Sequence, residues 1–216
     1  MNVIPFQTIF KGYHQHARCC LHCGSWFSRE SLFCQSCENL LWERHAETAP
    51  AFIDDSKVDA LFRWRPDEDR QLSKLLKTLK GGYLEQSFKH YAQEFLTQKK
   101  PKIPLNEVVL IPCPGKRPDH AWQFARQFSE LLDIPIWDIL QKSDTDQNHQ
   151  KQKSRSDRVK LRFSCQQTMS QKHVIFIDDI VTTGASLRAA RKAIGPCQSF
   201  RVWVIAQRVH SLRVPF

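Results

Sequence analysis

The sequence predicts an α/β fold in which helices cover both faces of a parallel sheet, preceded by a small cysteine-rich module. Two short apolar segments, Glu107–Ile111 and Val174–Ile177, are typical of parallel strands that are covered on both faces. Four cysteines in two close pairs lie between Cys20 and Cys37. With 216 residues, the chain suffices for one core of about 150 residues and a small appendage. We therefore expect a cysteine module over residues 1–45 and a main domain over residues 46–216.

The chain is basic, because 32 Lys and Arg residues outnumber 22 Asp and Glu residues and give a net charge of +10. Such a charge favours a phosphorylated ligand or a polyanionic partner, and it also serves solubility. No run of about 18 apolar residues occurs, and residues 1–10 lack the regions of a secretory signal. We therefore expect a cytoplasmic protein without membrane insertion, whose eight cysteines are reduced.

The paired cysteines have the spacing with which four thiolates surround a tetrahedral zinc ion. The pairs are Cys20-x2-Cys23 and Cys34-x2-Cys37, separated by ten residues. A structural zinc here would supply folding energy to a segment too small for its own core. We expect three aromatic residues to pack around it: Trp26, Phe27 and Phe33. The alternative is four reduced, buried cysteines without a metal.

After this module, the pattern predicts a connector, a strand and two helices. The connector spans Leu40–Ile53 and has a helical start, and Val58–Trp64 alternates apolar and polar residues as a half-buried strand does. A helix then starts at Pro66, has three acids in its first turn and ends at Lys80. A second helix spans Leu84–Leu96. The buried faces of the two helices comprise Leu72, Leu75, Leu76 and Leu79, and Leu84, Phe88, Tyr91 and Phe95.

The strand Glu107–Ile111 ends in the sequence Pro-Cys-Pro-Gly-Lys-Arg, and Asp119 caps the helix that follows. The buried face of that helix comprises Ala121, Phe124, Ala125, Phe128, Leu131 and Leu132. Beyond it, Gln141–Arg158 contains no aliphatic or aromatic side chain and cannot form a core element. We interpret it as a long, mobile, basic loop that either closes over a ligand or binds a polyanion.

The segment Val174–Leu187 combines an apolar strand, two acids and a hydroxyl-rich turn that leads into a helix. Asp178 and Asp179 can accept hydrogen bonds from the vicinal hydroxyls of a ribose. The turn precedes a helix N-terminus, whose free N–H groups bind anions; it contains Thr182, Thr183, Gly184, Ala185 and Ser186. A diol site beside a phosphate site indicates a phosphorylated ribose. The simpler interpretation is that the acids end a strand and the turn caps a helix. Phe200–Ala206 is the last predicted strand.

Val174–Leu187 closely resembles the phosphoribosyl-pyrophosphate signature of type I phosphoribosyltransferases. The resemblance implies a type I phosphoribosyltransferase-like sheet preceded by a zinc ribbon. It also implies that Asp178 and Asp179 hold the ribose hydroxyls and that the Thr182–Ser186 loop holds the 5′-phosphate. The ligand would be phosphoribosyl pyrophosphate or a nucleoside monophosphate, with magnesium bridging the pyrophosphate oxygens.

The order of motifs along most of the chain resembles that of ComF-like competence proteins, which are linked to uptake of transforming single-stranded DNA. These motifs are the zinc knuckle, the helix ending in Lys80, Pro112-x-Pro114, the basic loop and Val174–Leu187. The chain departs from the family after Pro114, where Asp119 and His120 stand in place of an Asn-Gln pair. Residues expected to face pyrophosphate are Lys80, Lys116 and Arg117, and the loop offers Gln147, Lys151, Lys153, Arg155 and Arg158.

Three functions stay open at this point. They are a nucleotide-sensing DNA-uptake factor, a phosphoribosyltransferase of nucleobase salvage, and a non-catalytic zinc-module adaptor. The first would have single-stranded DNA and DNA-processing proteins as partners. A salvage enzyme needs an aromatic ring that stacks on the base, and the sequence does not decide between Trp203, Phe62 and Trp64.

Overall fold

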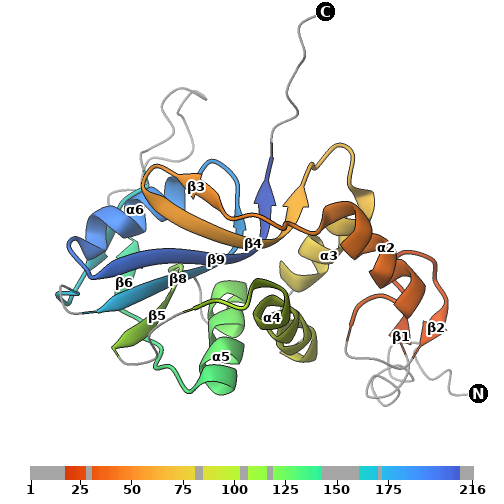
Figure 1. The fold of residues 1–216 in the computed structure, drawn as a ribbon, viewed down its shortest axis with the longest axis horizontal. Helices are drawn as coiled ribbons and strands as arrows, with labels where there is room; N and C mark the ends of the chain where they lie inside the picture. Colours follow the sequence, from red (N-terminus) through yellow and green to blue (C-terminus); the bar gives the residue numbers. More distant parts are fainter. Residues whose placement is uncertain are drawn as a thin grey trace, which may run out of the picture.

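A computed structural model gives the fold of the chain (Figure 1). It describes residues 18–27, 31–80, 85–102, 107–115, 119–142, 161–169 and 172–209. Its centre is a five-stranded sheet with the order β3-β4-β9-β8-β5. The strands β4, β9, β8 and β5 are parallel, and β3 is antiparallel to β4 at one edge. The strands are β3 (Ala51–Ile53), β4 (Ser56–Trp64), β5 (Val108–Pro112), β8 (His173–Val181) and β9 (Ser199–Arg208).

Helices cover both faces of this sheet, as the sequence predicts. Alternate residues of β8 point to opposite sides, so that Ile175 and Ile177 enter one core cluster and Val174 and Phe176 enter the other. The first cluster joins the sheet to α2 (Gln35–His45), α3 (Arg70–Lys80), α4 (Glu85–Lys99) and α5 (His120–Leu132). The second joins it to α6 (Ala185–Ile194) and to a hairpin of β6 (Leu140–Lys142) and β7 (Phe163–Cys165). The predicted fold class is confirmed.

Several buried faces predicted from helical spacing are also confirmed. All four leucines of α3 are buried, and so are Phe88, Tyr91 and Phe95 of α4. In α5, Phe124 and Phe128 are buried, but Leu131 is 37% exposed, contrary to the prediction, since it lies in the last turn, at the edge of the apolar stripe. Leu84 lies outside the described residues.

One predicted helix start is wrong. The helix expected from Pro66 begins at Arg70, because residues 66–68 form a turn in which Asp69 accepts a hydrogen bond from the Arg65 amide at 2.7 Å. The helical start predicted for the connector Leu40–Ile53 is confirmed as the second half of α2, whereas the strand β3 at the end of the connector was not predicted.

The strand β4 is not half-buried as predicted. Val58, Ala60, Leu61 and Phe62 are all at most 1% exposed, because β4 pairs with β3 and β9 and both of its faces are covered. Its polar residue Asp59 is buried as well. No helix in the described parts of the chain is long and apolar enough to span a membrane.

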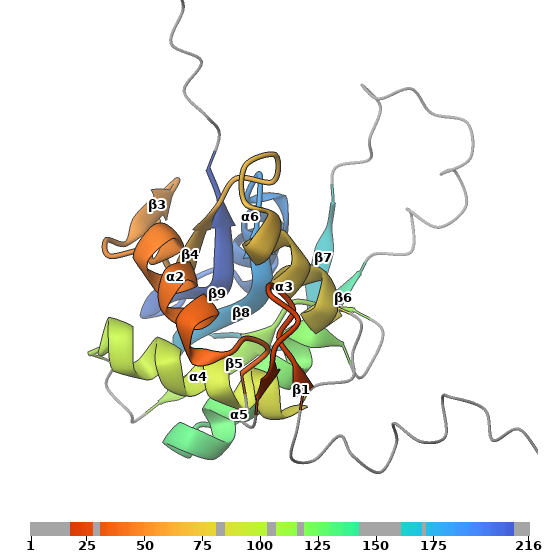
Figure 2. The same ribbon diagram turned by 90° about the vertical axis from the view of Figure 1, so that its right-hand side faces the viewer.

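The cysteine module packs directly against the main domain (Figure 2). Its short hairpin consists of β1 (Arg18–Cys19) and β2 (Trp26–Phe27) and is followed by α2. Phe33 and Leu41 are fully buried in the same cluster as the leucines of α3. Trp26 was predicted to pack around the cysteines, but it is 65% exposed and does not cover them. The boundary between residues 45 and 46 stays a prediction, since the core continues across it.

Candidate functional site

The four predicted cysteines lie together. Their sulfur atoms are within 4.8 Å of one another, and the Sγ atoms of Cys23 and Cys34 are 3.7 Å apart. A tetrahedral zinc ion with sulfur ligands at about 2.3 Å needs sulfur atoms about 3.8 Å apart. Cys20 and Cys37 are buried, whereas Cys23 is exposed. The arrangement therefore fits a four-thiolate metal site at the surface of the module.

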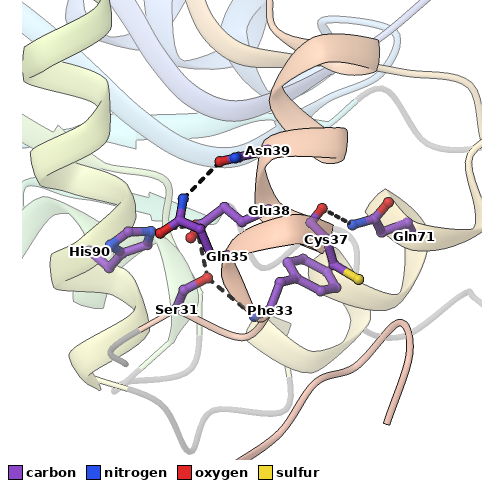
Figure 3. A network of polar contacts seen from close by, with 8 residues as sticks. All are labelled: Ser31, Phe33, Gln35, Cys37, Glu38, Asn39, Gln71 and His90. Carbon is purple, nitrogen blue, oxygen red and sulfur yellow. Dashed lines mark hydrogen bonds and ion pairs between the residues drawn. The ribbon is translucent and has the colours of Figure 1, made fainter. Parts of the chain in front are cut away.

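Polar contacts attach this cysteine cluster to α3 and α4 (Figure 3). The carboxylate of Glu38, which is 3% exposed, accepts a hydrogen bond from Ser31 at 2.8 Å and lies 2.6 Å from the His90 ring. From α3, Gln71 Nε2 donates to the carbonyl of Cys37 at 2.6 Å. One turn further along α3, Lys74 donates to the carbonyl of Leu21 at 3.3 Å. Thus α3 holds the backbone of both cysteine pairs.

A second site is a cleft of about 580 Å³ at the carboxyl ends of β4, β5 and β8. Open α/β sheets bind their ligands at this edge. The residues that line the cleft come from segments far apart in the sequence. They include Trp64, Lys80, Cys113, His120, Lys142, Asp178, Asp179, Thr182 and Ser186.

Asp178 and Asp179 lie within β8 and form the floor of the cleft. Both are buried, with exposed fractions of 7% and 5%. Two basic side chains lie beside Asp179: Lys80 Nζ is 3.3 Å from its Oδ2 atom, and His120 Nε2 is 3.4 Å from its Oδ1 atom. The acidic pair that was predicted to bind ribose therefore lies close to Lys80, which was predicted to face the pyrophosphate.

The two carboxyl groups differ in protonation. Burial and the neighbouring charge of Asp179 raise the pKa of Asp178 to about 8. Burial opposes ionisation of Asp179 as well, but its pKa is lowered because the contacts with His120 and Lys80 outweigh that effect. The hydrogen bond with Asp179 in turn raises the pKa of His120. At neutral pH the pair therefore offers one protonated and one ionised carboxyl group.

The predicted phosphate loop joins β8 to α6. Thr182 and Thr183 are exposed, Gly184 is buried, and Ala185 and Ser186 lie in the first turn of the helix rather than in the loop. Gly184 has φ +74°, and a Cβ atom there would lie 2.8 Å from Ile53 Cγ2. Only glycine fits this position. The loop thus presents hydroxyls and the positive end of a helix to the cleft.

Some predicted site residues lie outside the described residues. These are Lys116 and Arg117 of the pyrophosphate set, and Gln147, Lys151, Lys153, Arg155 and Arg158 of the basic loop. The stretch Gln141–Arg158 starts differently from the prediction, because Gln141 and Lys142 belong to the strand β6, and Lys142 lines the cleft.

The sequence reasoning missed His120 as a site residue. Its backbone follows the N-cap Asp119, whose carboxylate accepts a hydrogen bond from Trp122 N at 2.8 Å, as predicted for a cap. The signal was that β5 and β8 both end at the same edge, so the helix start after β5 faces the acids of β8. Ligand atoms of His120, Asp178 and Asp179 lie within 4.8 Å of one another and could hold a cation. Carboxyl oxygens suit Mg²⁺, which prefers oxygen ligands.

A buried acidic pair and a hydroxyl-rich helix start at the carboxyl edge of a parallel α/β sheet define a phosphoribosyltransferase-like protein. The chain belongs to the PRTase-CE family, whose model matches residues 60–209. This match contains the whole cleft and all of α3 to β9 but begins after the cysteine module.

Solved phosphoribosyltransferases resemble the chain at low sequence identity. The purine phosphoribosyltransferase of Pyrococcus horikoshii OT3 is 17% identical, with 56% of this chain and 69% of that chain covered and a TM-score of 0.34. The Trypanosoma cruzi hypoxanthine phosphoribosyltransferase is 17% identical, with 65% of this chain and 70% of that chain covered and a TM-score of 0.38. The Leishmania donovani adenine phosphoribosyltransferase is 11% identical, with 78% of this chain and 94% of that chain covered and a TM-score of 0.41. No protein of curated function matches the sequence significantly.

Proposed function

We propose that the cleft binds a 5-phosphoribosyl compound, either phosphoribosyl pyrophosphate or a nucleoside monophosphate. The observation that carries this proposal is the placement of a buried acidic pair and a helix-start loop in one cleft. Asp178 and Asp179 would bind the two ribose hydroxyls, one as a donor and one as an acceptor. The Thr182–Ser186 loop would bind the 5′-phosphate.

Lys80 would bind the pyrophosphate together with Lys116 and Arg117. The side chain of Lys80 is 48% exposed and pairs with Asp179, so an anion in the cleft can contact it without a change of fold. Magnesium would neutralise part of the pyrophosphate charge, and carboxyl oxygens of Asp178 and Asp179 would be candidate ligands for it.

Calorimetry tests this assignment directly. Phosphoribosyl pyrophosphate with magnesium is titrated into the wild type and into the double variant Asp178→Asn plus Asp179→Asn, and the double variant should lose binding while staying folded. The matched control is Asp67→Asn plus Glu68→Gln, which removes two adjacent exposed acids from the turn before α3. Equal affinity of the wild type and the cleft variant would disprove the ribose assignment.

We also propose that Cys20, Cys23, Cys34 and Cys37 hold one structural zinc ion without an open coordination position. The short sulfur separation supports this proposal. Elemental analysis should return about one zinc per chain, the content of a single four-thiolate site. A fully folded protein that contains no metal would contradict it.

We infer from the order of motifs a ComF-type role in the cytoplasm, in the handling of transforming single-stranded DNA. Direct DNA contact would use the cations of the basic loop, since single strands bind through phosphate neutralisation. Replacing Lys151, Lys153, Arg155 and Arg158 with Ala should then flatten the slope of log affinity against log salt by about 0.7 per lost phosphate contact. An unchanged slope with weaker binding of the phosphoribosyl ligand would instead make the loop a lid over the cleft.

A further inference from the structure

One aromatic ring of the cleft has no role in binding ribose or phosphate. Among the three aromatic residues that the sequence left open, Phe62 and Trp203 are 0% exposed in the core and cannot contact a ligand. Trp64 is only partly buried and lines the cleft together with Asp178 and Asp179. Apart from the imidazole of His120, it is the one aromatic side chain that lines the cleft in the part of the chain that the structure describes.

The indole of Trp64 is held in place by its surroundings. Its Nε1 atom donates a hydrogen bond to the Ser73 hydroxyl of α3 at 2.9 Å. Its backbone carbonyl accepts a hydrogen bond from Val209 at 3.0 Å, and the ring packs against the core cluster beneath α3. Since the polar group of the ring is bonded and its rotamer is restrained, stacking on a ligand would cost little conformational entropy.

Strand register gives the separation between the backbone of Trp64 and the start of the phosphate loop. Trp64 is paired with Arg208 of β9, and Val181 of β8 is paired with the preceding residue, Gln207. Trp64 is therefore level with Thr182, the first residue of the phosphate loop. The two strands are separated by β9 alone, which corresponds to about 10 Å across a sheet. A nucleotide with its phosphate on the loop can extend its base over this distance.

We propose that Trp64 stacks on the nucleobase of a nucleoside 5′-monophosphate, so that the cleft recognises the base as well as the phosphoribosyl group. This inference rests on the proposed function, because the loop must hold the phosphate for the base to reach the ring. Stacking on an indole needs only the π-face that every base has. The chemical class of ligand is therefore a complete nucleotide, and Trp64 is its base-binding residue.

Affinities for ligands with and without a base test the proposal. Calorimetry compares adenosine and guanosine 5′-monophosphates with ribose 5-phosphate on the wild type, Trp64→Leu and the control Trp26→Leu. Trp26 is a mostly exposed tryptophan of the cysteine module and does not line the cleft. Trp64→Leu should weaken binding of at least one nucleotide by about 5- to 150-fold, the value of one base–aromatic stack. Its affinity for ribose 5-phosphate should change less than about twofold, and Trp26→Leu should leave all ligands unaffected.

A second variant covers the case in which Trp64→Leu does not fold. Trp64→Phe keeps an aromatic ring, so it should bind the nucleotides nearly as well as the wild type. It should lose the quenching of tryptophan fluorescence that nucleotides cause in the wild type. Unaltered quenching in Trp64→Phe would overturn the inference, and so would an equal loss of ribose 5-phosphate and nucleotide affinity in Trp64→Leu. If the wild type binds neither ribose 5-phosphate nor the nucleotides, the proposed function itself is wrong.

Discussion

At the scale of single residues, the two adjacent acids of β8 differ because their neighbours differ. Asp179 faces Lys80 and His120, whereas Asp178 is buried against Asp179 and the thiol of Cys113. Burial raises the pKa of the Cys113 thiol, and the same thiol therefore stays neutral beside Asp178. One carboxyl group stays protonated and the other ionised, which suits two hydroxyls that each donate and accept.

The raised pKa of Asp178 predicts a pH-dependent cost to stability. A carboxyl group whose pKa rises from an ordinary 3.8 to about 8 on folding stabilises the fold while it is protonated. This stability is fully present below pH 3.8 and is lost as pH rises towards 8. Asp178→Asn should therefore raise the melting temperature more at pH 8 than at pH 5, as measured by circular dichroism. A difference that stays constant across this range would contradict the assignment.

Lys80 offers a second prediction at this scale. Lys80→Gln should reduce affinity for phosphoribosyl pyrophosphate about tenfold or more, because a hydrogen bond to a charged group is lost. Its affinity for ribose 5-phosphate should fall less, since that ligand lacks the pyrophosphate. Lys77→Gln is the matched control, an exposed lysine one turn earlier in α3. Similar losses for both ligands, measured by calorimetry, would place Lys80 elsewhere in the site.

At the scale of elements, the connection from β8 to α6 depends on one backbone conformation. Gly184→Ala should destabilise the protein by about 1–3 kcal/mol in urea unfolding, because of its positive φ and the contact with Ile53. The comparison is the same change in an Ile53→Ala background, which removes the side chain that the added Cβ would contact. In that background Gly184→Ala should cost only the strain of the positive φ. Equal costs of Gly184→Ala in the two backgrounds would show that the contact with Ile53 is unimportant.

Sequence reasoning succeeded for elements whose residues are consecutive. Val174–Leu187 contains a strand, a loop and a helix start in one stretch, and the structure shows all three. The reasoning failed where strand order matters: β4 alternates polar and apolar residues but lies between β3 and β9. The contributions of His120 and Trp64 to the cleft depend on that same order. No local pattern encodes which strand ends become neighbours.

At the scale of the whole molecule, α3 contacts both candidate sites. Gln71 and Lys74, near its start, bind the backbone of the two cysteine pairs, and Lys80 at its end pairs with Asp179. The four buried leucines of α3 fix it in the core between these contacts. A change in the cysteine module is therefore expected to act on the position of Lys80.

Metal removal should show this dependence. A strong zinc chelator is expected to lower the affinity of the cleft for phosphoribosyl pyrophosphate, because loss of the metal removes the folding energy of the cysteine module. In Gln71→Leu the chelator should change this affinity less than in the wild type, since one link between the module and α3 is absent. Gln35→Leu is the control, because Gln35 is an exposed glutamine whose side chain donates a hydrogen bond to Asn39 within α2. Calorimetry with and without the chelator measures both effects.

Because α3 contacts both sites, an effect of the metal on ligand binding implies an effect of the ligand on metal binding. Thermodynamic reciprocity requires that the factor by which metal loss weakens the ligand is also the factor by which the ligand strengthens metal retention. Transfer of zinc to a chromogenic chelator should accordingly be less complete at equilibrium when phosphoribosyl pyrophosphate is present. Through α3, the supply of activated ribose in the cell would help to decide how firmly the protein keeps its metal.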